Sequence, residues 1–248
     1  STQSIENLVD VLHHAGLAVL WLENQSGCKG ICDRVPNAIT RNLSDPKLCT
    51  SGECFDEIML SQISERMATL PVDRLHRGIV VIMHQMGSHG PAYYKRSPEA
   101  FKKFKPECAT NILQDCTRSE VTNAYNNTIL YTDHFLNKVV DYLKSIKPNA
   151  QTAMLYVADH GESLGEKNIY LHGLPYSIAP DVQKRIPWIQ WLSNEFMARN
   201  HIKPACLEKQ IDTRLSHDNY FHSILGLMKV QTSAYKPEFD VYSSCTGN

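Results

Sequence analysis

Apolar residues along this chain recur in two spacings that alternate from the amino terminus onward. From Ile5 to His14 the spacing is helical, and Gly16 ends the segment. The continuous apolar run from Leu17 to Leu22 then predicts a buried strand. Repeated helix–strand units of this kind are typical of an α/β layer fold. We therefore expect one α/β domain built around a sheet.

The rest of the chain continues this alternation. Helical spacing predicts helices over residues 54–70, over 117–146 with Ser119 as its N-cap, and from the cap Ser216 to Met228. Apolar runs predict a central buried strand over 78–83 and further strands over 154–157 and 186–192. Pro187 suggests that the last of these strands lies at an edge. Polar loops are expected over 24–32, 41–53, 93–116 and 175–184.

Composition sets limits on the class of protein. The chain has 248 residues, of which 42% are hydrophobic, and this is enough to bury the core of a single domain. Its formal net charge of −1 gives no field that would select nucleic acid, so we expect no nucleic-acid partner. No apolar run is long enough to cross a bilayer. The chain opens on Ser1 without an initiator Met or a signal peptide, and we expect it to be part of a longer protein.

The cysteines fall in couples that are close in sequence. They are Cys28 and Cys32, Cys49 and Cys54, Cys108 and Cys116, and then Cys206 and Cys245. An even number in such couples favours disulfides and an oxidising compartment. The alternative is a structural zinc cluster, but no couple has the Cys-x-x-Cys spacing of a zinc knuckle. We expect the cysteines to pair in sequence order.

Candidate chemistry is concentrated just after the predicted strand that ends at Val157. Five potential ligands follow within a short stretch, namely Asp159, His160, Glu162, Glu166 and His172. Polar residues at the carboxyl end of a strand are typical of sites in parallel sheets. Asp159 and His160 could share a zinc or manganese ion if the chain leaves strand geometry there, and Gly161 permits such a turn. The alternative is a polar loop whose Asp caps a helix.

Three sequence blocks together resemble one family. They are the stretch Asp-His-Gly-Glu-Ser-Leu-Gly-Glu at 159–166 with Tyr-Leu-His-Gly at 170–173, the stretch His-Gln-Met-Gly-Ser-His-Gly-Pro at 84–91, and Cys-Lys-Gly at 28–30 with Asp-Arg-Val-Pro at 33–36. In this order they resemble the lipid A phosphoethanolamine transferases, which include the mobile colistin-resistance enzymes. The resemblance covers essentially the whole chain.

The resemblance implies a fold, a reaction and a compartment. The fold is an alkaline-phosphatase-like α/β/α sandwich with a central, mostly parallel sheet and disulfide-stapled loops. The reaction is zinc-dependent transfer of phosphoethanolamine from phosphatidylethanolamine to lipid A, which gives polymyxin resistance. Residues 1–248 would be a soluble periplasmic catalytic domain at the bacterial inner membrane, and we expect a monomer.

The resemblance also assigns roles to residues. It implies Asp159 and His160 as zinc ligands and Lys29, His89 and His172 as contacts of the phosphoethanolamine group. Without it, a solvated surface lysine is the preferred interpretation of Lys29. We leave His84 out as a structural histidine, and His217 as incidental to the first turn of its helix. The basic segment 93–116 could approach lipid phosphates, but a solvated face is the preferred interpretation.

This chain departs from the family pattern at its start. The family's nucleophilic threonine, a further glutamate ligand and a membrane-spanning domain all belong upstream of the first helix. With two of its four ligands, the chain is expected to bind zinc weakly and to expose an apolar edge where a strand belonged. Two other functions stay open, namely a sulfatase or phosphodiesterase of the same fold, and an inactive module that binds zinc or phosphate.

Overall fold

The computed structural model describes residues 5–50, 52–146 and 150–247. The strands are β1 (Ala18–Glu23), β2 (Asn37–Ile39), β3 (Cys49–Thr50), β4 (Glu53–Cys54), β5 (Ile79–His84), β6 (Ala153–Val157), β7 (Ser163–Leu164), β8 (Tyr170–Leu171) and β9 (Trp188–Leu192). The helices are α1 (Leu8–His14), α2 (Ile58–Ala68), α3 (Val72–Leu75), α4 (Arg118–Ser145), α5 (Asp181–Lys184), α6 (Asn194–Arg199), α7 (Pro204–Glu208) and α8 (His217–Leu227).

Strand β1 is the centre of a parallel three-stranded sheet in the order β2-β1-β5. All six of its residues are buried, because helices cover both faces of the sheet. Leu20 and Leu22 pack into a core with α2 and α4, and Val19 and Trp21 pack into a second core with α1 and α8. Because successive side chains of a strand point to opposite faces of the sheet, β1 contributes to both hydrophobic cores.

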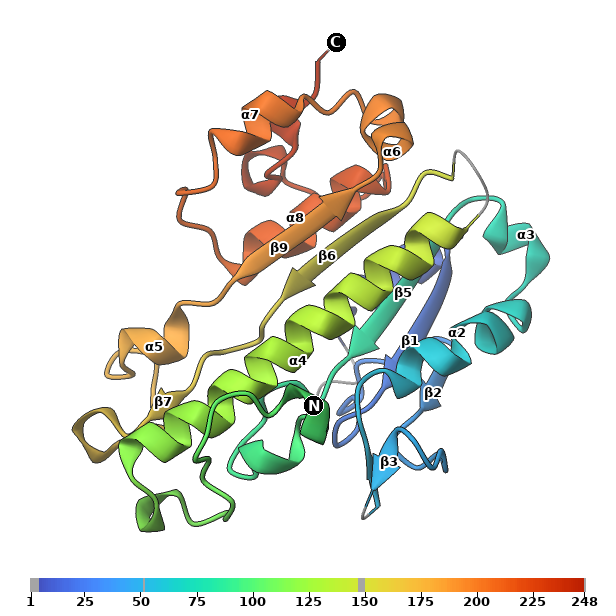
Figure 1. Cartoon of the computed structure of the whole chain (residues 1–248). Helices are drawn as coiled ribbons and strands as arrows, with labels where there is room; N and C mark the ends of the chain where they lie inside the picture. The colour runs from blue at the N-terminus through green and yellow to red at the C-terminus, as the bar shows by residue number, and fades with distance from the viewer. Residues whose placement is uncertain (1–4, 51, 147–149, 248) are drawn as a thin grey trace.

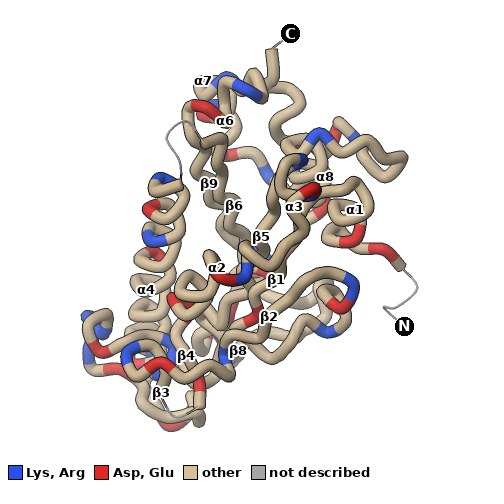
Figure 2. Tube along the Cα trace, turned by 90° about the vertical axis from the view of Figure 1, so that its right-hand side faces the viewer, with Lys and Arg blue, Asp and Glu red and all other residues tan. Residues whose placement is uncertain are grey.

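The result is three layers. Figure 1 shows α4 lying along the sheet, and Figure 2, turned by 90°, shows α2 and α4 on one side and α1 and α8 on the other. The predicted α/β/α sandwich is therefore present. Among the described residues, no helix combines the length and the hydropathy needed to cross a membrane.

Strand β6 belongs to a different sheet from β5. It pairs antiparallel with β9, and β9 has no other partner among the described residues, which agrees with the predicted edge position of the Pro187 segment. The prediction of a central buried strand over 78–83 is wrong. Strand β5 is paired only with β1 and its residues are half-buried or exposed, because no described strand covers its second edge.

Two helix starts differ from the predictions because capping boxes decide them. Helix α4 begins after Thr117, whose hydroxyl accepts from the amide of Glu120 while the Glu120 carboxylate accepts from the Thr117 amide; Ser119 lies inside the helix. In the same way, helix α1 begins after Asn7, and Ile5 lies outside it and is exposed. In both helices the amides of the N-cap residue and of the third helical residue have no acceptor within the helix, and these side chains accept from them.

All eight cysteines are in disulfides, and they pair in sequence order. Pairing in the expected order is confirmed, and a zinc cluster built on these cysteines is excluded because none is left as a thiolate. The Cys28–Cys32 bridge closes the loop after β1, and the Cys206–Cys245 bridge joins α7 to the last turn of the chain.

Candidate functional site

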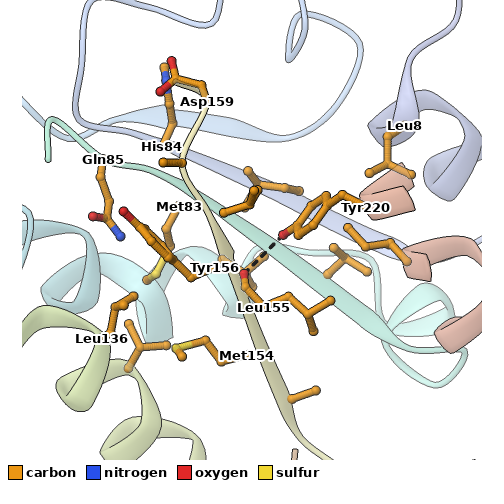
Figure 3. Close-up of a pocket in the computed structure, with 18 of the residues that line it drawn as sticks. Leu8, Met83, His84, Gln85, Leu136, Met154, Leu155, Tyr156, Asp159 and Tyr220 are labelled. Carbon is orange, nitrogen blue, oxygen red and sulfur yellow. Dashed lines mark hydrogen bonds between the residues drawn. The ribbon is translucent and has the colours of Figure 1, made fainter. Parts of the chain in front are cut away.

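The candidate site lies at the carboxyl ends of β1, β5 and β6, where three polar loops begin. Glu23 ends β1 and His84 ends β5, and the two residues are paired across the parallel ladder. Asp159 follows β6 by two residues. Figure 3 shows Asp159 and His84 close to one another at these strand ends. The edge is therefore the position that parallel sheets use for ligands.

A buried glutamate that the sequence analysis missed organises the first loop. The Glu23 carboxylate accepts from Nε1 of Trp21 at 2.9 Å and from the amide of Gln25 at 2.8 Å, and it lies 2.7 Å from Nδ1 of His84. The hydrogen bond to Glu23 raises the pKa of His84. Burial opposes ionisation of Glu23, but His84, Trp21 and Gln25 together hold its pKa below the usual value. His84 is thus a satisfied structural histidine, as interpreted from the sequence.

A second missed carboxylate holds the loop after β5. Asp56 is buried and accepts from the amides of Met86 and Gly87 at 2.8 and 2.9 Å, and from Nδ2 of Asn24 at 2.8 Å. The amide of His89 in turn donates to the carbonyl of Met86 at 3.1 Å. Asp56 therefore fixes the backbone that carries His89. In the sequence Asp56 falls inside the predicted helix 54–70, so the pattern did not set it apart from a carboxylate on the surface of a helix.

Asp159 and His160 lie together after β6. Oδ2 of Asp159 is 3.6 Å from Nε2 of His160, while Nδ1 of His160 lies 3.0 Å from the carbonyl of Gly161. A carbonyl only accepts, so Nδ1 carries the proton and Nε2 has a free lone pair. Two ligands of one tetrahedral zinc lie about 3.4 Å apart, given bonds of about 2.0–2.1 Å. The spacing of these two atoms is compatible with a shared ion.

Gly161 is required for close packing. The chain leaves strand geometry after Val157, as a shared ion requires, and the Gly161 backbone does so without a positive φ. A Cβ at this position would lie 2.0 Å from the carbonyl oxygen of Val182, and the Gly161 amide donates to the carbonyl of Gln183 at 3.0 Å. Gly161 thus lets helix α5 pack directly against the loop that carries His160.

Glu162 and His172 complete a cluster with His160. One ligand atom from each of the three lies within 4.8 Å of the others, and the rings of His160 and His172 are 3.6 Å apart between centroids. Nδ1 of His172 is 3.1 Å from Oε1 of Glu162. The ring of His89 lies 6.2 Å from that of His172. The structure therefore brings His89, His160 and His172 together from two loops.

The donor set of this cluster fits zinc. Two imidazoles and a carboxylate are a known zinc-ligand set, and in each histidine Nδ1 is already bonded to an acceptor, as is usual for metal ligands. Oε2 of Glu162 is buried and has no hydrogen-bond partner among the described residues, and so it is an orphaned acceptor. Glu162 and His172 therefore lie beside the two expected ligands, Asp159 and His160, as further potential donors.

The other sequence candidates are not members of this cluster. Lys29 is exposed on the Cys28–Cys32 loop, and its backbone has a φ of +48°. Glu166 is engaged by Arg118 at 3.0 Å and by the amide of Leu164, so it supports the loop. His217 is incidental to ligation, since Nε2 of its ring lies 2.9 Å from the carbonyl of Ala158.

The basic segment 93–116 is largely neutralised within itself and by its neighbours. Lys102 pairs with Glu107 at 2.6 Å, and Lys105 pairs with Glu99 at 3.0 Å. Arg96 pairs with Glu53 at 2.6 Å. In Figure 2 basic and acidic positions alternate around the start of α4. The arrangement supports a solvated, ion-paired face over a dedicated anion-binding surface.

A fold and site of this kind define a member of the sulfatase family. A model of that family, described as Sulfatase, matches residues 1–230, and the chain belongs to it. The chain is 44% identical over 241 residues to phosphoethanolamine transferase EptA of Salmonella typhimurium, which is 97% of this chain and 43% of that protein. It is 37% identical over 237 residues to phosphatidylethanolamine transferase Mcr-2 of Escherichia coli, which is 93% of this chain and 42% of that protein.

Solved structures agree with these relatives. The soluble domain of lipooligosaccharide phosphoethanolamine transferase A from Neisseria meningitidis superposes with a TM-score of 0.91 at 42% identity, over 98% of this chain and 72% of that domain. The whole integral membrane protein gives the same score over 45% of its length. The resemblance read from the sequence blocks and the predicted fold are confirmed. The chain spans less than half the length of the full relatives.

Proposed function

We propose that this chain is the soluble catalytic part of a zinc-dependent enzyme that transfers phosphoethanolamine from phosphatidylethanolamine to a phosphate of lipid A. The relatives carry phosphoethanolamine transferase names, and one acts on lipooligosaccharide by its title. The observation that carries the proposal is the cluster of Asp159, His160, Glu162 and His172 at the carboxyl edge of the sheet. Such a cluster suits a reaction in which charge develops on phosphoryl oxygens.

His160 is the central ligand in this proposal. Its free Nε2 faces Asp159 on one side, and the Glu162–His172 pair stands on the other. Bound zinc supplies a Lewis acid that offsets charge on phosphoryl oxygens. Asp159 and His160 form the expected ligand pair, and the neighbouring Glu162 carboxylate provides a further donor for a zinc shell.

Lys29, His89 and His172 would bind and orient the phosphoethanolamine group. His89 and His172 lie on adjoining loops, and each can donate a hydrogen bond to a phosphoryl oxygen. Lys29 adds an exposed ammonium on the disulfide-closed loop after β1. The three side chains come from separate segments, so phosphate binding depends on the tertiary structure.

The nucleophile and the membrane anchor belong to other parts of the whole protein in this proposal, as the resemblance implies. The whole relative from Neisseria meningitidis is described as an integral membrane protein. We therefore place the protein at the periplasmic face of the inner membrane, where both lipid substrates are found. Polymyxin resistance is the expected consequence, because phosphoethanolamine masks negative charge on lipid A.

Zinc stoichiometry tests the metal site without relying on activity. We expect the 248-residue chain to bind zinc, measured by elemental analysis after dialysis, and His160→Ala to abolish it. The matched control is His217→Ala, because His217 contacts the backbone next to Asp159 without joining the cluster. Retained zinc in both His160→Ala and Asp159→Ala would contradict the site. Loss of zinc in Glu162→Gln but not in Asp159→Ala would show that Glu162, and not Asp159, binds the ion.

Transfer activity tests the reaction in the whole protein. We expect Lys29→Ala, His89→Ala and His172→Ala each to lower the phosphoethanolamine mass increment on lipid A, while the unfolding midpoint changes little. Near-native transfer in all three variants would place the phosphate elsewhere.

A hydrolase of the same fold is the second candidate, and the family match itself favours it. Hydrolysis of p-nitrophenyl sulfate or bis-p-nitrophenyl phosphate without lipid modification would support a sulfatase or phosphodiesterase. Zinc binding with neither activity in the whole protein would favour a binding module.

A further inference from the structure

The segment that follows the His160 cluster, residues 172–180, is exposed and apolar, and we call it the rim loop. Its first seven residues are all exposed, although they include Leu174, Tyr176 and Ile178. The exposed fractions of these three residues are 38%, 81% and 68%. Single apolar residues are scattered over the surface of every protein, but three of them within five positions form a patch, and such patches mark interaction sites.

The exposed side chains of the rim loop stand on a defined turn. The carbonyl of Pro175 accepts from the amides of Ile178 and Ala179 at 3.0 and 2.9 Å. Ala179 is buried, and so is Gln183 in the helix α5 that follows. The Gln183 side chain donates to the hydroxyl of Ser163 at 2.8 Å, next to Glu162 of the cluster. The rim loop is therefore fixed to the candidate site, and little conformational freedom is lost when its side chains are covered.

The charge beside the patch is positive. No Asp or Glu occurs between Glu166 and Asp181, so the patch itself carries no negative charge. The single carboxylate of Asp181 lies 3.8 Å from Lys184 and 2.9 Å from Arg185, which leaves one positive charge in excess. Nζ of Lys184 lies 5.1 Å from the centroid of the Tyr176 ring. A tyrosine with a neighbouring lysine is suited to the interface of a bilayer, where the ring is partly buried and the ammonium meets lipid phosphates.

The rim loop begins inside the candidate site. His172 is its first residue and also a member of the cluster with His160 and Glu162. Figure 1 shows α5, which follows the rim loop, next to β7 and beyond the end of β6. A lipid whose headgroup is bound at His172 stays attached to its acyl chains in the bilayer, so the bilayer surface lies within one headgroup of this residue. The patch that starts at Leu174, two positions further on, lies where that surface has to be.

We propose that the rim loop is a membrane contact, in which Leu174, Tyr176 and Ile178 enter the headgroup region of the bilayer and Lys184 meets the lipid phosphates. This inference rests on the proposed function, and it specifies which surface of the described chain faces the bilayer while a lipid is bound. Binding to a bilayer strengthens with the apolar area that is buried and with attraction to anionic lipids, and the rim loop supplies both.

Vesicle binding tests this proposal without any catalytic activity. The probe is sucrose-loaded vesicles of phosphatidylethanolamine and phosphatidylglycerol, sedimented with the 248-residue chain. We expect the double variant Tyr176→Ser/Ile178→Ser to lower the partition coefficient at least about 10-fold, because full burial of one apolar side chain already contributes about that factor. Both side chains are exposed, so the midpoint of urea denaturation should not move.

The matched control is Ile211→Ser. The Ile211 side chain is 81% exposed, as is that of Tyr176, but it lies on a separate segment between α7 and α8. Vesicle binding of Ile211→Ser should equal that of the unmodified chain. An equal loss in Ile211→Ser and in the double variant would overturn the proposal, because it would show general adsorption of apolar surface.

Fluorescence locates the rim loop in the whole protein reconstituted in vesicles. Tyr176→Trp should add an emission that lipids with brominated acyl chains quench, whereas the emission added by Ile211→Trp should not be quenched. The unmodified protein supplies the background of the native tryptophans. Unquenched emission from Tyr176→Trp would refute the membrane contact and would show that another part of the protein covers the loop.

Two further outcomes would overturn the proposal. Equal sedimentation of the double variant and the unmodified chain would show that other residues bind the vesicles. A dimer in native mass spectra without lipid, lost in the double variant, would assign the rim loop to a second copy. Failure of the proposed function is distinct from these outcomes. Vesicle binding through the rim loop in a protein that adds no phosphoethanolamine to lipid A would support the membrane contact and refute the reaction.

Discussion

Replacing Asp56 by alanine should destabilise the protein well beyond a typical surface change. The carboxylate is buried and accepts from the Met86 and Gly87 amides and from the Asn24 side chain, while Asn24 keeps its bond to the carbonyl of Cys54 at 2.9 Å. The variant therefore leaves three N–H groups without their acceptor.

Each buried donor without an acceptor costs about 1–3 kcal/mol. Met86 and Gly87 are half-buried, so water can reach part of the loop, and the low end of the range applies to each of the three groups. We therefore expect Asp56→Ala to lower the free energy of unfolding by about 3 kcal/mol. Asp56→Asn keeps one acceptor oxygen and should lose about half as much.

Urea denaturation of the 248-residue chain measures this difference, with Asp45→Ala as the matched control. Asp45 also accepts from two backbone amides, those of Lys47 and Leu48 at 2.7 and 3.0 Å, but it is only half-buried and its hydrogen bond to Lys47 is exposed to solvent. Water replaces its oxygen as a partner, so Asp45→Ala should cost about 1 kcal/mol. Equal losses for the two alanine variants would refute the reasoning, because they would show that burial of the acceptor does not matter.

Three further outcomes are expected. Gly161→Ala should lower the free energy of unfolding, measured by urea denaturation, by about 1–3 kcal/mol and should reduce zinc binding, because the new Cβ would lie 2.0 Å from the Val182 carbonyl oxygen. An unchanged denaturation midpoint would contradict this. The hydrogen bond from Arg34 holds the pKa of Asp10 below its ordinary 3.8. Asp10→Asn should therefore lower the free energy of unfolding by about 1 kcal/mol at pH 7, and this loss should vanish as the pH falls below 3.8. A loss that does not depend on pH would disprove the ion pair. Replacing both cysteines of the Cys206–Cys245 bridge by alanine should cost about 4 kcal/mol, since the bridge closes a loop over a separation of 39 residues; a loss below about 1 kcal/mol would contradict the chain-entropy account.

Much of the fold could be predicted because its signals are local. The apolar run at Leu17–Leu22 marked the most buried strand, and the stripe over 117–146 marked the longest helix. Disulfide pairing followed from closeness in sequence. The helix starts at Ser119 and Ile5 were wrong because the capping boxes Thr117–Glu120 and Asn7–Asp10, which are local sequence patterns, were not used.

The candidate site was predictable in part. Asp159 and His160 are adjacent in sequence, so a motif could show them together, and the resemblance supplied Lys29, His89 and His172. Glu23 and Asp56 gave no such signal. Each acts through partners from distant segments, His84 for Glu23 and Met86 for Asp56, and those contacts exist only after the sheet has formed.

By itself, then, the sequence determined the α/β alternation, the disulfide framework and the residue types of the proposed zinc and phosphate site. These depend on periodicity, spacing and side-chain chemistry, which are properties of short stretches. Only the tertiary structure decided that His160, Glu162 and His172 form one cluster, that Glu23 and Asp56 hold its loops, and that no described strand pairs with the second edge of β5. Strand pairing and burial are long-range, so an apolar stretch such as residues 79–84 reads the same at the centre of a sheet and at its edge.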